Sequence, residues 1–287
     1  DMGWNFVLRQ YGNHQLKLHW LITGDTFLEI DPVEPPEGAP DVTPYIRGVI
    51  TPSGGSVVAV DCFKHMSLAN LRVIDVPTGE TTLEISIEDF MCDVLFPRQS
   101  IIEPTQDGKG VILANGENAE ILHVDLETGK IHRRDVAITG EMDPESDGNS
   151  WQGLAIQDVA VHPAGDLLAT TTGEGFIRMW TLPELEEVGE PIPTAVEGIN
   201  KMTYMPDVVS PVRWSPDGRF LIHVDKDKRI VLRDETDLQI IHSFERPPLA
   251  TEETEWGEIP HGWENSVLNF AFSKDSSAIL VRTSHGV

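Results

Sequence analysis

Short turns of similar composition recur along the 287-residue chain at nearly constant intervals. Each turn is rich in residues such as Pro, Gly, Asp and Ser and has a short apolar run on either side. The distances between the first residues of successive turns are 54, 57, 53 and 58 residues. Because Pro fixes φ and Gly reaches positive φ, such turns favour hairpins between short strands. The five turns occupy residues 51–54, 105–108, 162–165, 215–218 and 273–276.

The repeat is clearest in residues 155–182, which predict strands at 156–161, 167–172 and 176–182. These runs contain many Val, Ile and Thr residues, which suit a pleated sheet. A third run in most repeats ends near an Asp or a Trp, and a weaker fourth run follows it. Repeated four-stranded antiparallel sheets cannot bury both faces alone, but they do so when they stack around an axis. The sequence therefore predicts an all-β chain that forms a β-propeller.

The predicted propeller is a single domain over residues 1–287 with four complete four-stranded blades. The run at residues 4–30 lacks a first strand, and the run at residues 266–287 supplies only the first two strands. We therefore predict part of a six- or seven-bladed ring and a segment of a longer protein. The complete blades are predicted at about residues 44–87, 99–136, 155–189 and 209–245.

Three stretches carry a resemblance to a known family. They are Ser-Pro-Asp-Gly-Arg-Phe at 215–220, His-Pro-Ala-Gly-Asp at 162–166 and Ile-Arg-Met-Trp at 177–180. They resemble the repeats of the WD40 family, and the similarity covers nearly the whole chain. The Trp-Asp pair of the family is never complete here; Trp180 is followed by Thr, and Asp75 is preceded by Ile. A divergent WD40 propeller and a quinoprotein-like propeller fit the pattern equally well.

The charge of the chain limits its partners. It has 47 acidic and 21 basic residues, a net charge of −26. Such a chain is repelled by phosphate backbones and by anionic membrane surfaces, so we expect neither nucleic acid nor membrane as a partner. No run of 18 apolar residues is present, so no segment is expected to span a membrane. The charge can also serve solubility alone.

The two cysteines indicate the redox state of the cellular compartment in which the protein is expected. Cys62 falls in a predicted strand and Cys92 in a connector. A disulfide between them is possible, but two free thiols in a reducing compartment is the more ordinary interpretation. We therefore predict a cytoplasmic protein.

Five long connectors lengthen the repeat and are expected to emerge at the same end of the blades. They span residues 31–44, 88–98, 137–153, 190–208 and 245–265, and they contain twenty acidic residues against three basic ones. An acidic surface with aromatic anchors suits recognition of a basic or amphipathic protein segment. Alternatively, the rings cap the blade ends. The candidate contact residues are Phe90, Phe96, Trp151, Tyr204, Trp256 and Trp263, with His65 and Met66 from an enlarged loop at 61–70.

No catalytic motif or paired-cysteine metal motif is present, and no cofactor is expected. The ten histidines are scattered, and His123, His132, His223 and His242 fall in predicted strands. One acidic loop resembles a calcium loop in its alternating oxygen ligands, but Leu154 stands where a bidentate Glu is required. A solvated loop is the default interpretation there. The weak calcium candidates are Asp143, Glu145, Asp147 and Asn149.

Two functions remain open from the sequence. The preferred one is a non-catalytic scaffold that recognises another protein or another domain of its own protein. The alternative is a propeller attached to an enzyme of the peptidase, quinoprotein or signalling type, which it would serve as a substrate gate or sensor. In that case the catalytic domain would lie outside this segment.

Overall fold

The computed structural model describes residues 6–11, 15–35, 44–63, 67–90, 100–115, 119–136, 156–172, 175–194, 211–225, 227, 229–244 and 267–283. Within these ranges the regular structure consists of β-strands, and no helix occurs. The prediction of an all-β chain is confirmed. The chain divides into two compact units, which are described one at a time.

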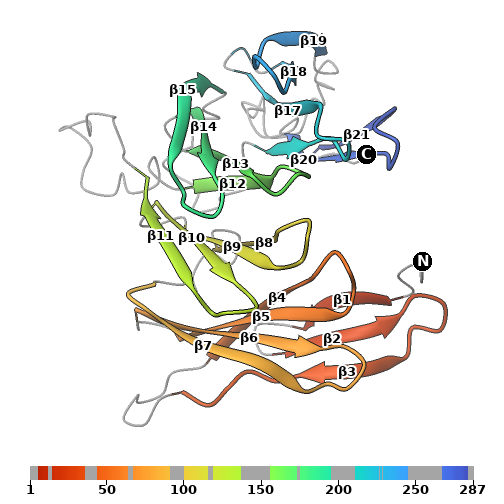
Figure 1. Ribbon diagram of the computed structural model, residues 1–287. Helices are drawn as coiled ribbons and strands as arrows, with labels where there is room; N and C mark the ends of the chain where they lie inside the picture. The colour runs from red at the N-terminus through yellow and green to blue at the C-terminus, as the bar shows by residue number, and fades with distance from the viewer. Residues whose placement is uncertain are drawn as a thin grey trace, which may run out of the picture. The chain divides into compact units, whose positions relative to one another are not determined.

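The first unit comprises Asp1–Ala137 together with Pro183–Leu185. It contains one three-stranded and two four-stranded antiparallel sheets (Figure 1). The three-stranded sheet consists of β1 (Phe6–Tyr11), β2 (Gln15–Trp20) and β3 (Thr26–Ile30). The second sheet consists of β4 (Pro44–Ile50), β5 (Ser56–Phe63), β6 (Leu68–Asp75) and β7 (Thr81–Glu88). The third consists of β8 (Ser100–Pro104), β9 (Gly110–Asn115), β10 (Glu120–Asp125) and β11 (Ile131–Asp135).

The second unit comprises Ile138–Leu182 together with Glu186–Val287. It contains two four-stranded sheets and one two-stranded sheet, all antiparallel. The first consists of β12 (Ile156–Val161), β13 (Leu167–Thr172), β14 (Phe176–Thr181) and β15 (Glu187–Pro193). The next consists of β16 (Val212–Trp214), β17 (Phe220–Val224), β18 (Ile230–Asp234) and β19 (Ile240–Phe244). The two-stranded sheet pairs β20 (Val267–Phe272) with β21 (Ile279–Thr283).

Strand order agrees with the repeat that the sequence predicted. Each four-stranded sheet pairs its strands in chain order, so every connection within a sheet is a hairpin. β12, β13 and β14 match the predicted strands to within one residue. The predicted four-stranded antiparallel sheets are therefore confirmed, whereas ring closure and the number of blades stay predictions.

The turns between first and second strands share one hydrogen-bonding pattern. The N–H of Gly54 donates to the carbonyl of Thr51, and that of Gly218 donates to Ser215, each over 2.9 Å. The hydroxyl of the first turn residue also holds the following strand. Ser215 Oγ accepts from the N–H of Phe220 at 3.0 Å, and Thr105 Oγ1 accepts from that of Gly110 at 2.8 Å. This recurring geometry explains why the turn residues repeat along the sequence.

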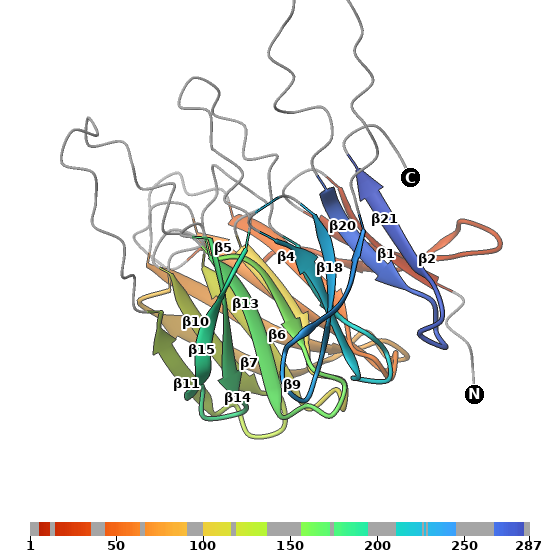
Figure 2. The ribbon, with the colours of Figure 1, turned by 90° about the horizontal axis from the view of Figure 1, so that it is seen from above.

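Neighbouring sheets of a unit meet at the strand that comes first in the chain in each sheet; in the three-stranded sheet this is β1, which corresponds to a second strand of the repeat. In the first unit β1 contacts β4 and β4 contacts β8, and in the second β12 contacts β16 and β16 contacts β20. Figure 2 shows β13, β14 and β15 of the second unit, in green, running side by side. Apolar side chains fill the layers between sheets. Leu18, Ile46 and Ala59 form part of one layer in the first unit, and Ile177 and Leu221 part of one in the second.

Strand β13 is buried on both faces. Every residue of β13 after Leu167 is buried, including three threonines that a one-sided sheet would expose. Thr170 satisfies its hydroxyl internally, because Trp180 Nε1 donates to Thr170 Oγ1 at 2.9 Å within the same sheet. Trp180 is only 1% exposed. Strand β13 is thus a central strand of its sheet and is buried on both of its faces.

Candidate functional surface

The antiparallel order places different loops at the two ends of each four-stranded sheet. The turns after the first and third strands lie at one end, which we call the turn end. The loop after the second strand lies at the other end, as do the chain positions where connectors enter the first strand and leave the fourth. We call this the connector end. Hydrogen bonds between neighbouring sheets show whether their connector ends lie on the same side of a unit.

In the first unit, Arg72 joins the connector ends of the first two sheets. Asp61 of β5 is fully buried and accepts from Arg72 Nε at 2.8 Å and from Arg72 Nη2 at 3.0 Å. Asp61 also accepts from the backbone N–H of Val33 at 3.2 Å. Arg72 Nη2 donates in addition to the carbonyl of Asp31, the residue after β3, at 2.8 Å. The end of β3 therefore lies against the connector end of the second sheet.

Arg133 makes the same kind of link one sheet further along. Its Nε lies 3.2 Å from Oε1 of Glu120, which begins β10 and is buried. Its Nη2 donates to the carbonyl of Glu88, which ends β7, at 2.6 Å. The connector ends of all three sheets in the first unit consequently face the same way.

The second unit aligns its two four-stranded sheets through contacts at both ends. At the connector end, Asp158 of β12 accepts from the N–H of Val212 at 3.1 Å and from Arg213 Nη1 at 2.5 Å. At the turn end, His162 Nε2 donates to the carbonyl of Gly218 at 3.1 Å. The connectors of this unit also enter and leave the sheets on one side.

The electrostatics of the connector end follow from these pairs. Burial raises the pKa of the Asp61, Glu120 and Asp158 carboxyl groups, although the neighbouring arginines oppose the rise. The arginines that pair with them range from largely buried, as Arg72 is, to exposed, as Arg133 is. In sequence, the connectors contain twenty acidic residues against only three basic ones. The chain around the connector end is strongly acidic as a result.

The predicted contact residues fall into two groups. Phe90 is 2% exposed and packs in the core of the first unit with Tyr45 and Leu113. It is therefore a core side chain, which agrees with the alternative that some connector rings cap the sheets. The other candidates lie outside the described residues, namely Phe96, Trp151, Tyr204, Trp256, Trp263, His65 and Met66. The calcium candidates Asp143, Glu145, Asp147 and Asn149 also lie outside them.

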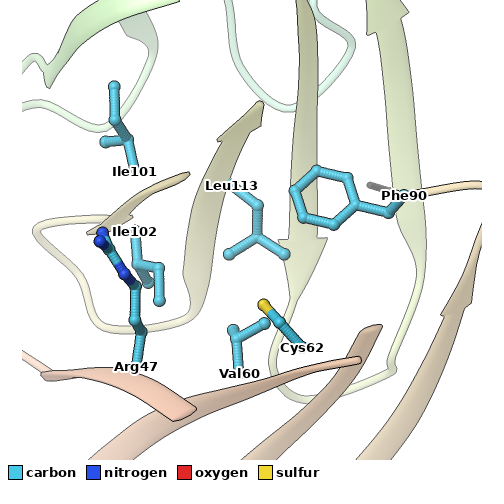
Figure 3. A pocket seen from close by; sticks show the side chains of 7 residues that line it. All are labelled: Arg47, Val60, Cys62, Phe90, Ile101, Ile102 and Leu113. Carbon is cyan, nitrogen blue, oxygen red and sulfur yellow. The ribbon is translucent and has the colours of Figure 1, made fainter. Parts of the chain in front are cut away.

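A small cavity lies between the second and third sheets of the first unit. Its volume is about 10 Å³, which is the space of one water molecule and far below that of a metabolite site. Figure 3 shows Val60, Ile102 and Leu113 around the cavity, with the ring of Phe90 beside Leu113 and the side chain of Arg47 beside Ile102. This cavity is a packing defect of an apolar layer and offers no small-molecule site.

The strand histidines take structural positions. His123, His132, His223 and His242 lie in β10, β11, β17 and β19, as predicted. His223 is fully buried; its Nδ1 lies 2.9 Å from the carbonyl oxygen of Val224, and its Nε2 accepts from Arg233 Nε at 2.8 Å. Burial lowers the pKa of His223 to about 4. The neutral ring therefore accepts a hydrogen bond from Arg233. No sequence motif indicates this contact.

The prediction of free thiols is wrong for Cys62. This residue of β5 is disulfide-bonded and 1% exposed. The other cysteine of the chain, Cys92, lies outside the described residues. Disulfides persist mainly in oxidising compartments, so this bond weighs against a cytoplasmic location, which stays a prediction.

Among the residues with a described position, no three His, Cys, Asp or Glu side chains gather in a way that could hold a metal ion. The same part of the chain contains no helix long and apolar enough to cross a membrane.

Comparison with known proteins gives partial similarity only. No family model matches the chain. It is 28% identical over 129 residues to Protein HIR1 of Gibberella zeae, 24% over 139 residues to Protein HIR1 of Aspergillus oryzae, and 28% over 131 residues to Protein hir-1 of Neurospora crassa. These matches cover 42–46% of this chain, and the chain spans 12–13% of the length of those relatives.

Proposed function

We propose that this chain is part of a WD40-like β-propeller that binds another protein, or another domain of its own protein, at the connector end. The sheet arrangement within each unit supports the propeller, because successive sheets pair their strands in chain order and meet at their first strands. A blade that buries both faces between neighbours has this construction. The proposed role is recognition without catalysis.

One observation carries the proposal. Within each unit the connectors attach on a single side of the sheets, and they contain twenty acidic residues against three basic ones. A basic or amphipathic protein segment complements such a surface, since opposite charge speeds encounter and apolar contacts then hold the complex. Nucleic acids and anionic membranes carry the same sign of charge as the chain and are not proposed as partners.

The test neutralises acidic residues at one end of the sheets and compares them with a matched set at the other. Crosslinking and pull-down are carried out with the 287-residue chain at low and high salt. Three connector residues, Glu252, Glu253 and Glu255, are replaced by Gln in one variant. The control variant replaces three exposed acidic residues of the turn end, Glu80, Glu127 and Glu186, in the same way.

We expect partners of the unaltered chain to be basic, to be released by salt, and to be lost from the connector variant but not from the control. Equal loss from both variants would show that only net charge matters. Recovery of no partner at either salt concentration would count against the proposal as a whole.

A further inference from the structure

The outer strand of the sheet β16–β19 differs from the other outer strands. All five residues of β19 are exposed, and three of them are large and apolar: Ile240 is 45% exposed, Ile241 48% and Phe244 39%. β18 pairs with one edge of β19, and no strand of the described chain pairs with the other edge. Half of the backbone N–H and C=O groups of such an edge point outward without a strand partner.

The other outer strands carry features that block edge pairing. Charged side chains and prolines at an edge prevent a further strand from joining the sheet. β7 contains Glu84 and Glu88, and β11 contains Arg133 and Arg134. β15 has glutamates and two prolines, and β3 has Glu29. β19, with the sequence Ile-Ile-His-Ser-Phe, contains no Asp, Glu, Lys, Arg or Pro.

The turn that leads into β19 carries negative charge, which can attract a basic side chain of a binding partner. Asp234 ends β18, and Glu235 and Asp237 lie in the hairpin turn that follows and are exposed. At the strand itself, the ring of His242 packs against the ring of Phe244 at a centroid distance of 4.3 Å, which widens the apolar surface. The edge thus presents apolar side chains with negative charge at one end.

The charge of the chain and the exposed edge of β19 indicate what kind of segment can bind there. A second copy of this chain would bring a second net charge of −26 to the same place, which opposes pairing of two identical edges. A segment with basic side chains is attracted instead, and a β-strand is the conformation that satisfies the outward backbone groups.

We propose that β19 accepts an added strand from a partner protein, namely an extended segment in which Lys or Arg alternates with β-branched or aromatic residues. Its backbone pairs with the outer edge of β19, and its side chains cover Ile240 on one face of the sheet and Phe244 on the other, with Ile241 at the register shift between them. A basic side chain pairs with the acidic turn. This site runs along the outer edge of one sheet, and its acidic turn lies at the turn end, so it adds a second contact surface to the proposed function.

The probe is a fluorescent peptide of about ten residues that alternates Lys and Val, a length that covers a typical strand. Fluorescence anisotropy measures its binding to the 287-residue chain. The control peptide has the same sequence with alternate amides N-methylated, which removes backbone donors and keeps charge and side chains. The protein variants are Ile241→Lys and, as a control, Val188→Lys. Val188 is 43% exposed on β15, whose edge is already protected.

We expect saturable binding of the unmodified peptide, at least about tenfold weaker binding of the methylated one, and a similar loss with Ile241→Lys but not with Val188→Lys. If Ile241→Lys does not fold, Ile241→Thr keeps strand propensity while removing the apolar surface, and it is expected to weaken binding in the same direction.

Equal binding of the two peptides, or equal binding by the two lysine variants, would overturn the proposal, because charge alone would then explain the association. A concentration-dependent dimer in sedimentation that Ile241→Lys abolishes, with no binding of the peptide, would also overturn it and identify a second copy as the occupant. Failure of the connector-end experiment would leave this test unaffected, because it uses neither the connectors nor their charges.

Discussion

At the scale of single residues, the structure depends on polar groups that are buried with defined partners. His223 is the clearest case, since it is buried between the carbonyl of Val224 and the guanidinium of Arg233 and must stay neutral there. Burial also lowers the pKa of Arg233. A proton added to the ring would place two positive charges in contact away from water.

The chain is therefore expected to lose stability in mild acid through His223. Its pKa falls from 6.5 to about 4 on folding. As pH drops from the upper to the lower of these values, the unfolded chain takes up a proton that the folded chain does not, so roughly 3 kcal/mol of stability is lost. His223→Gln should flatten the pH dependence of urea unfolding in this window. His242→Gln, at an exposed position, should leave the slope unchanged; an unchanged slope in both variants would contradict the assignment.

Substitution of two glycines tests the contact between His162 and Gly218 at the turn end. Gly218 and Gly165 both have positive φ, 77° and 80°, and occupy equivalent turns. A Cβ at Gly218 would lie 2.6 Å from His162 Nε2, whereas nothing lies within 4 Å of one at Gly165. We expect Gly165→Ala to cost about 1 kcal/mol from backbone strain and Gly218→Ala at least about 1 kcal/mol more. Chemical denaturation measures both, and equal losses would mean that His162 moves aside freely.

At the scale of strands and sheets, the features that could be predicted from the sequence are those set by local residues, namely the turns and the strands beside them. The turns with Pro and Gly specify the hairpins, and β12 to β14 were therefore predicted to within one residue. The pairing of Arg72 with Asp61 and the hydrogen bond from Trp180 to Thr170 of the preceding strand depend on side chains that are brought together only by strand pairing and packing. No spacing in the sequence indicates these contacts. The exposed edge of β19 does have a signal in the sequence, namely a fourth run without charged residues or proline, which lies outside the turn pattern that defines the repeat.

The disulfide at Cys62 is expected to stabilise the second sheet. A crosslink restricts the unfolded chain, and its removal from a domain typically costs about 2–5 kcal/mol. Reduction should therefore lower Tm, and Cys62→Ala should lower it by a similar amount and no longer respond to reductant. Thiol titration of the denatured, unreduced chain checks the premise: reactive thiol in freshly purified protein would show that the bond does not form in solution.

At the scale of the whole chain, net charge is the dominant property. A charge of −26 repels itself in a compact state, and the buried ion pairs at the sheet joints are screened much less than the surface. We expect sodium chloride, raised from about 0.05 M to about 0.5 M, to increase the free energy of unfolding by roughly 1 kcal/mol. A decrease would mean that attractive surface pairs outweigh the repulsion. Potassium chloride at equal ionic strength serves as the control for ion-specific effects.

Arg72 and Arg133 reach back to carbonyl groups at the end of the sheet that precedes their own in the chain. During synthesis from the amino terminus, the acceptor therefore leaves the ribosome before the donor does. Each new sheet finds its docking point already formed, and assembly can proceed in one direction, sheet by sheet, without waiting for the rest of the chain.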